Sequence, residues 1–198
     1  GHWMVMYGVM HVVEKLDPEA IAQARPAVIE AAPARRFVKM WTVADLASSF
    51  KDGWEEPRNR ENGKKLFGEA GCNKCHWFDN QGIKSAPDLT ETAAKYKTGE
   101  ELLKHIIDPS ASILEGYETW LIETSEGDLV DGRIVKDDGK ALHVNPKLQN
   151  PDEVIVVPKD QIEDKTKMSS SAMPTGLLVT LTKAEILDLL AYLRSSKN

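Results

Sequence analysis

Apolar side chains recur at helical spacing along several stretches of the chain, which predicts a set of amphipathic helices. Two of these helices are predicted over residues 59–70 and 99–107. The second is expected to end there because Asp108-Pro109 follows it, and a proline stops a helix. A third is predicted from Thr182 almost to the end, since Thr182 and Glu185 carry the signature of an N-terminal capping box. We expect the first and third helices to pack against each other.

The first 57 residues show a different arrangement of apolar positions. An apolar segment over residues 3–13 precedes Asp17-Pro18, a typical helix start. Residues 34–50 hold further apolar side chains at near-helical spacing, and packing against the rest of the domain is their favoured role. We therefore predict an N-terminal apolar segment and helical extension over residues 1–57.

Between about residues 117 and 164 the apolar positions instead follow the pattern of strands. Turns rich in glycine and aspartate separate four short apolar runs, at residues 120–124, 129–135, 141–144 and 154–157. These runs predict a small antiparallel sheet inserted into a helical domain. The fold class predicted for the whole chain is therefore mainly α.

Composition narrows the choice of partners and of environment. A net charge of −6 argues against nucleic acid as a partner. The longest apolar stretch, residues 3–13, is too short to cross a bilayer. It is interpreted as an edge strand or as the remnant of a preceding domain, with a homo-oligomer or docking contact as the alternative. Because the chain begins at Gly1 rather than at a methionine, we expect it to be part of a longer protein.

Both cysteines of the chain fall in one motif, Cys72-Asn73-Lys74-Cys75-His76. A C-x-x-C-H run is the attachment site of a c-type haem, in which both thiols form thioethers and the histidine reaches the iron. A thioredoxin-like redox pair would need the motif to open a helix in a βαβ unit, which the flanking residues do not predict. A zinc site needs about four ligands, and the chain has no other cysteine.

The motif therefore predicts one covalently bound haem c, with iron, attached through Cys72 and Cys75 and with His76 as the proximal ligand. Covalent attachment argues for the periplasm or another extracytoplasmic compartment, because the free thiols meet haem there. On the other side of the haem, a methionine is a common partner for a histidine ligand. The loop before the last predicted helix offers Met168 and Met173.

The order of the segments GKKLF, GCNKCH, APDLT and LLKHIIDPS resembles a class I cytochrome c. From about Trp41 to the end, the chain is also similar to the haem-binding domain family found in planctomycete and verrucomicrobial proteins. That similarity runs through DPSASILEGYETW, IETSEGDLVDGRIV and SSAMPTGLLVTLTKAEILDLLAYL. It implies a cytochrome c-like helical core over residues 58–198, with the β insertion at about 117–164. It also implies monohaem electron transfer, often as one module of a larger redox protein.

The resemblance further implies roles for three residues. The Pro87 carbonyl would accept the Nδ1–H of the proximal histidine, and Leu89 would pack on the haem ring, although an ordinary proline turn is the alternative for this loop. Met173, followed by a proline, matches the family's Met-Pro pair and is favoured as the distal ligand. Met168 is the alternative, and His105 ranks third. Either methionine could instead fill the core.

The predicted function is electron transfer with redox donor and acceptor proteins, and no catalysis by this domain unless it is fused to a catalytic one. The alternative is a peroxidase-like enzyme or a gas sensor, in which the sixth coordination position is open or its ligand is labile. An enzyme of that kind would need a distal acid-base group, and His105 and His143 are the histidines available for it.

Overall fold

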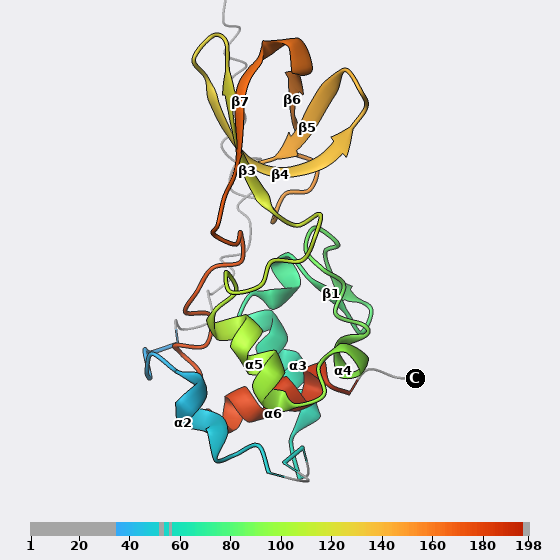
Figure 1. The fold of residues 1–198 in the computed structure, drawn as a ribbon. Helices are drawn as coiled ribbons and strands as arrows, with labels where there is room; N and C mark the ends of the chain where they lie inside the picture. The colour runs from blue at the N-terminus through green and yellow to red at the C-terminus, as the bar shows by residue number, and fades with distance from the viewer. Residues whose placement is uncertain (1–34, 52–53, 56, 196–198) are drawn as a thin grey trace, which may run out of the picture. The chain divides into compact units, whose positions relative to one another are not determined.

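The computed structural model describes residues 35–51, 54–55 and 57–195, and the predictions for residues 3–13 and for the helix after Asp17 lie outside these ranges. Within the described part of the chain, no helix combines the length and the apolar character needed to cross a membrane. The helices, shown in Figure 1, are α2 (Val43–Ala47), α3 (Arg60–Glu69), α4 (Thr92–Lys95), α5 (Gly99–Ile107) and α6 (Lys183–Leu193).

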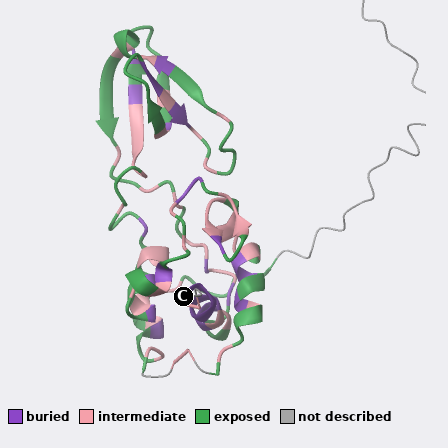
Figure 2. Ribbon diagram, turned by 90° about the vertical axis from the view of Figure 1, so that its right-hand side faces the viewer, coloured by how far each residue is buried: buried purple, intermediate pink, exposed green. Residues whose placement is uncertain are grey.

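The three predicted helices are confirmed as α3, α5 and α6, and each begins at a side-chain cap. Asn59 caps α3 by accepting a hydrogen bond from the backbone of the third helical residue. Thr98 and Thr182 both form capping boxes, which satisfy otherwise free N–H groups at the starts of α5 and α6. Most residues of α6 are buried, so this helix forms the centre of the helical core (Figure 2).

Helices α3 and α6 pack against each other, as predicted, and they do so through a glycine. A Cβ atom placed on Gly63 would lie 2.3 Å from the Asp188 carbonyl oxygen and 2.6 Å from the Tyr192 Cβ. The Asp188 carboxylate accepts hydrogen bonds from the Asn59 backbone N–H and the Asn62 side-chain amide, at 3.1 and 2.9 Å. The start of α3 is therefore fastened to α6 at close range.

A short hairpin that was not predicted follows the cysteine motif. It consists of β1 (Trp77–Phe78) and β2 (Gln81–Gly82), joined by Asp79 and Asn80 with φ values of 48° and 59°. Two central residues with positive φ are typical of a type I′ turn, which matches the twist of paired strands. The hairpin packs on α6, because the rings of Phe78 and Tyr192 lie edge to face with centroids 5.0 Å apart.

The Tyr192 hydroxyl joins α6 to this hairpin by hydrogen bonds. It accepts from the Gln81 side-chain amide at 2.8 Å and donates to the Asp79 carboxylate at 3.2 Å. Burial, helped by the nearby Asp79 charge, raises the pKa of Tyr192 to about 12. The hydroxyl therefore keeps its proton in the folded protein at pH values where an unfolded tyrosine, with a pKa of about 10, loses it.

We expect Tyr192→Phe to lower the free energy of unfolding at pH 8 by about 1–2 kcal/mol, since the variant loses both hydrogen bonds. The wild-type contribution is complete below pH ~10 and is lost as the pH rises to about 12, because the unfolded chain then releases the proton first. Urea unfolding from pH 8 to 12 should therefore show the two proteins converging in stability. A gap that stays constant over this range would contradict the assignment.

The prediction of a mainly α fold is wrong, because 28% of the structure is helical and 22% is strand. Five antiparallel strands form one sheet in the order β6-β5-β4-β3-β7. Their bounds are β3 (Thr119–Thr124), β4 (Leu129–Asp137), β5 (Ala141–Asn145), β6 (Ile155–Pro158) and β7 (Ile162–Lys167). The sheet has its own apolar core, separate from that of the helices, formed by Ile122, Leu142, Val144 and Val157.

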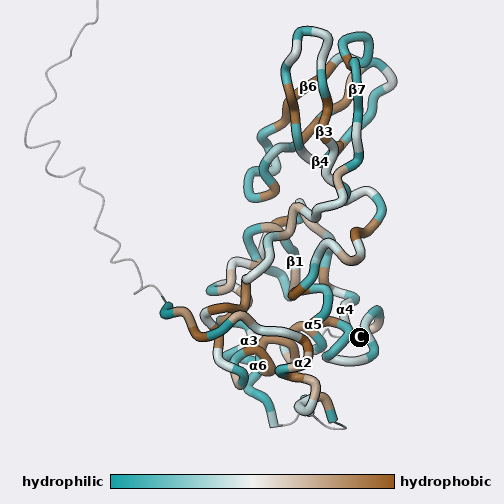
Figure 3. Tube along the Cα trace, turned by 60° about the vertical axis from the view of Figure 1, so that its left-hand side comes forward, coloured by the Kyte–Doolittle hydropathy of each residue, from teal (hydrophilic) through white to brown (hydrophobic). Residues whose placement is uncertain are grey.

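The four predicted apolar runs are confirmed as strands β3 to β6, and β7 was missed. Strand β7 pairs with β3 and forms an edge of the sheet. Only its first residue, Ile162, is apolar, and the strand is mostly hydrophilic (Figure 3). Charged residues are a common protection for an edge strand, so β7 carries no alternating pattern that a sequence could reveal.

The predicted packing role of residues 34–50 is correct for only some of the described positions. Leu46, in α2, is fully buried in the helical core, and Trp41 and Phe50 pack against that core. In contrast, the side chains of Phe37 and Met40 are 66% and 62% exposed. The extended chain at this point is held through its backbone instead, since the N–H groups of residues 38 and 39 point to the Val179 carbonyl.

Candidate cofactor site

A cavity of about 770 Å³ lies among α3, α4, α5 and the loop that precedes α6. Its volume falls in the range of roughly 300–1,000 Å³ that is usual for small-molecule and cofactor sites. Most of its lining is apolar, with contributions from Phe67, Leu102, Ile106 and Leu193. Five of the residues predicted for the site also line it, namely Cys72, His76, Pro87, Leu89 and Met173, whereas Cys75 and Met168 do not.

The cysteine motif is shaped by the end of α3. Gly71 adopts the left-handed conformation, with a φ of 76°, and so ends the helix. Residues Cys72–Lys74 then form one 3₁₀ turn, and the backbone N–H of His76 donates to the Cys72 carbonyl at 2.9 Å. This compact turn holds both half-buried cysteines and the histidine within one short, hydrogen-bonded segment.

Both cysteines are free thiols whose acidity is lowered by their surroundings. Burial raises the pKa of Cys72 to about 11 and also raises the pKa of Cys75. Reactive redox cysteines have lowered pKa values, so this environment does not favour that use. Across the described residues, moreover, no three His, Cys, Asp or Glu side chains gather as a metal site would require.

The imidazole of His76 has a defined tautomer. Its Nδ1 lies 2.7 Å from the Pro87 carbonyl oxygen, which can only accept a hydrogen bond, so Nδ1 carries the proton. Burial lowers the pKa of His76 and favours the neutral ring. Nε2 is then the nitrogen available as a ligand, and the carbonyl contact increases its donor strength. This arrangement suits a histidine that holds a metal or an iron cofactor through Nε2.

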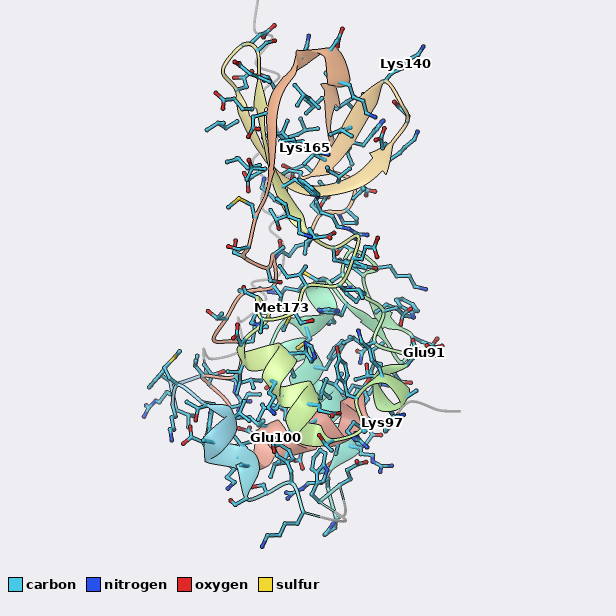
Figure 4. All side chains as sticks on the ribbon, viewed as in Figure 1. Glu91, Lys97, Glu100, Lys140, Lys165 and Met173 are labelled. Carbon is cyan, nitrogen blue, oxygen red and sulfur yellow. The ribbon has the colours of Figure 1, made fainter. Side chains whose placement is uncertain are left out.

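The two candidate methionines lie in different surroundings. Met173 lines the cavity, on the connection that leads from β7 to α6 (Figure 4). Its backbone N–H donates to the Ser171 hydroxyl, and the Ser171 N–H donates in turn to the Ser110 hydroxyl, at 3.1 and 3.0 Å. The backbone N–H of Met168 instead donates to the Thr119 carbonyl, beside the first strand of the sheet.

The two remaining candidate histidines also lie in different surroundings. His105, on α5, lines the cavity, with its ring centroid 4.7 Å from that of Tyr96. Burial and the nearby Lys95 lower the pKa of His105. His143, on β5, lies outside the cavity lining, and its Nε2 is 2.9 Å from the Asp138 carboxylate. Of these two histidines, His105 is therefore the one that remains an alternative to Met173 as a candidate distal ligand.

Sequence reasoning missed the residues that the sheet segment brings to this site. Arg133, on β4, and Leu148, in the connection between β5 and β6, both line the cavity. They lie far along the chain from the cysteine motif, and although Arg133 falls in the IETSEGDLVDGRIV segment of the resemblance, that segment assigns it no role. Arg133 is half-buried on β4, which is unusual for an arginine, but this burial becomes visible only in the structure.

Comparison with known proteins finds a match to a family model over part of the chain. Residues 60–118 match the family model described as Cytochrome c. The match begins at the first residue of α3 and ends just before β3, so it contains the cysteine motif, Pro87 and α5 but not the sheet or Met173. No curated protein matches the chain.

Proposed function

We propose that this chain, which contains a c-type cytochrome domain over residues 60–118, is a monohaem electron carrier with histidine and methionine as axial ligands. The cytochrome domain supports a haem-binding role in electron transfer between redox partners. The observation that carries the finer proposal is that Cys72, His76 and Met173 line one cavity, with the His76 ring held by Pro87. The bound haem c would supply an iron that exchanges one electron.

Each residue has a part in holding that group. Cys72 and Cys75 bind it through thioethers, and His76 provides the proximal nitrogen while the Pro87 carbonyl orients the ring. Leu89, with the apolar lining, packs on the macrocycle and excludes water. Met173 provides the distal sulfur, a soft ligand that favours the reduced iron and so raises the reduction potential. Met168 is less suited, because it does not line the cavity.

The proposal extends to the organisation and location of the chain. Residues 58–198 form one cytochrome c domain with its β insertion at about 117–164, preceded by the extension over residues 1–57. We place this domain in the planctomycete and verrucomicrobial haem-binding family, as one module of a larger redox protein. The compartment is periplasmic or otherwise extracytoplasmic, as is usual for c-type cytochromes. The apolar segment 3–13, outside the described residues, is the proposed docking or oligomer contact.

Absorption spectra of the air-oxidised protein test the axial ligands directly. Ferric haem with a methionine ligand shows a weak far-red charge-transfer band, which we expect in the wild type. Met173→Ala should abolish this band and open the site to cyanide and carbon monoxide. Met168→Ala is the matched control, since it removes a methionine five residues away along the same connection, and it should retain the band.

His105→Gln completes the set of variants. If the wild type lacks the band and only His105→Gln changes the spectrum, the distal ligand is His105 rather than Met173. If the wild type lacks the band and binds carbon monoxide readily, the sixth position is open and the electron-carrier proposal gives way to a sensor or an enzyme. Absence of covalently attached haem, measured by intact mass, would overturn the proposal as a whole.

A further inference from the structure

Arg133 makes three contacts outside the sheet that carries it. Its Nη1 donates to the Ser85 carbonyl at 2.7 Å, and its Nε donates to the Gly116 carbonyl at 2.8 Å. The guanidinium group also lies over the Tyr117 ring, 3.9 Å from the ring centroid. Ser85 follows the cysteine motif, whereas Gly116 and Tyr117 follow α5, so one side chain connects two segments beside the cavity.

The local structure of β4 fits this use of Arg133. Gly132 packs closely on β5, since a Cβ atom placed on it would lie 2.4 Å from the Asn145 carbonyl oxygen. The pairing of β4 with β5 then shifts register between Ile134 and Lys136. Irregularities of this kind turn a strand and re-aim its side chains. Arg133 therefore lies between a close backbone contact and a bulge, where its direction is strongly determined.

Ser85 is held by the sheet segment at a second point. Its side chain is buried, and its hydroxyl donates to the Leu148 carbonyl in the connection between β5 and β6. The same hydroxyl lies 3.3 Å from the Cys75 carbonyl oxygen. Ser85 is thus fixed through its backbone by Arg133 and through its side chain by Leu148, two residues before Pro87.

We propose that the sheet acts as a clamp on the proximal side of the cofactor. Arg133 and the Leu148 carbonyl fix Ser85, Ser85 positions Pro87, and Pro87 orients the His76 imidazole. Arg133 and Ser85 are positioning residues in this account, which rests on the proposed function. A well-held carbonyl acceptor makes His76 a stronger donor and so favours the oxidised iron. Loosening the clamp should therefore raise the reduction potential.

The loop that carries Ser85 and Pro87 also has hydrogen bonds that do not involve the sheet. The clamp has an effect only if it restrains the loop beyond what these bonds achieve. The Ala86 N–H donates to the Cys75 carbonyl at 3.0 Å, and the Leu89 N–H donates to the Trp77 carbonyl at 2.9 Å. If these two bonds alone held Pro87, changes at Arg133 would leave the loop unaffected. The exchange of these amide protons with solvent distinguishes the two cases.

Two variants that preserve charge test the clamp from opposite sides. Arg133→Lys keeps the positive charge but loses the planar guanidinium group, whose nitrogen atoms donate to two carbonyls at once. Ser85→Ala removes the hydroxyl that binds Leu148. The control is Thr124→Val, which removes a buried hydroxyl within β3 whose partner is the Asp128 N–H, at 3.1 Å. Thr124 does not line the cavity, so the control reports general weakening of the sheet.

In the intact 198-residue chain, hydrogen exchange of peptides covering residues 85–92 should be on the order of tenfold faster in both test variants, which corresponds to the loss of about one hydrogen bond. The control should match the wild type in these peptides. In the haem-loaded proteins, both test variants should shift the reduction potential upward, and the control should not. If Arg133→Lys does not fold, Ser85→Ala still decides the question.

The outcomes separate this inference from the proposed function. Unchanged exchange in residues 85–92 overturns the clamp, whether or not haem is attached. Faster exchange with an unchanged or lowered potential overturns the claim that the clamp positions His76. A wild-type protein without covalent haem overturns the proposed function and removes the role in positioning a ligand, while the exchange data still establish whether the sheet holds the loop.

Discussion

Gly63→Ala should destabilise the protein by about 3 kcal/mol, measured as the free energy of unfolding in urea. The added Cβ would lie 2.3 Å from the Asp188 carbonyl oxygen and 2.6 Å from the Tyr192 Cβ. Neither atom is at the end of a flexible side chain, so the helices themselves must move apart. That movement would also strain the bonds from the Asp188 carboxylate to the start of α3.

The same helix supplies a matched control, Gly68→Ala. A Cβ atom on Gly68 would meet only the Asn73 side-chain nitrogen, at an ordinary contact distance of 3.6 Å. Alanine is a better helix former than glycine, so this variant should be more stable than the wild type by about 0.5 kcal/mol. Equal effects of the two substitutions would show that the stability of α3 depends on helix propensity and not on its contact with α6.

The helical part of the fold was predictable because its signals are local. A cap at Asn59, Thr98 or Thr182 and a stripe of apolar residues are contained within a dozen positions of the sequence. The four apolar runs of the sheet carry a comparable signal, and they appear as strands β3 to β6. Where the pattern within a segment decides its structure, the sequence is sufficient.

The errors in the fold prediction arise where the structure of a segment depends on the segments that it pairs with. Strand β7 exists because β3 offers it a partner, and its own residues after Ile162 are polar. The sheet was therefore underestimated, and the mainly α assignment failed with it. The β1–β2 hairpin did leave a local sign, since an Asp79-Asn80-Gln81-Gly82 sequence suits a turn with positive φ values. That sign was available and was missed.

The residues of the candidate site also fall into two groups, those that local patterns predict and those that they do not. Of the residues proposed from short motifs, Cys72, His76 and Met173 line the cavity together, whereas Cys75 does not. Arg133 and Leu148 reach the same cavity from the sheet segment through contacts that span about 50 to 60 positions of the sequence. No pattern around either residue reports a partner so distant. Sequence reasoning therefore suggested the candidate ligands of the site but not the residues of the sheet segment that line the cavity with them.

Gly82→Ala should have the largest effect of any single methyl group added near the site. Gly82 has a φ of +99°, and its Cβ would lie 2.0 Å from the His76 carbonyl oxygen and 3.0 Å from the Asn73 carbonyl oxygen. Both contacts are with the backbone of the cysteine motif. The hairpin must therefore retreat from the motif, and the free energy of unfolding should fall by more than ~3 kcal/mol. We also expect less covalently attached haem, measured by intact mass, because the motif loses its support.

Gly127→Ala separates the effect of backbone strain from the effect of steric overlap with neighbouring atoms. Gly127 lies in the turn between β3 and β4 with a φ of +86°, and no atom lies within 4 Å of its Cβ position. This variant bears the cost of a left-handed alanine alone, about 1 kcal/mol, and its haem content should equal that of the wild type. If Gly82→Ala were no more harmful than Gly127→Ala, the hairpin could not be pressed against the motif. The difference between the two variants therefore measures how closely β2 supports the backbone of His76.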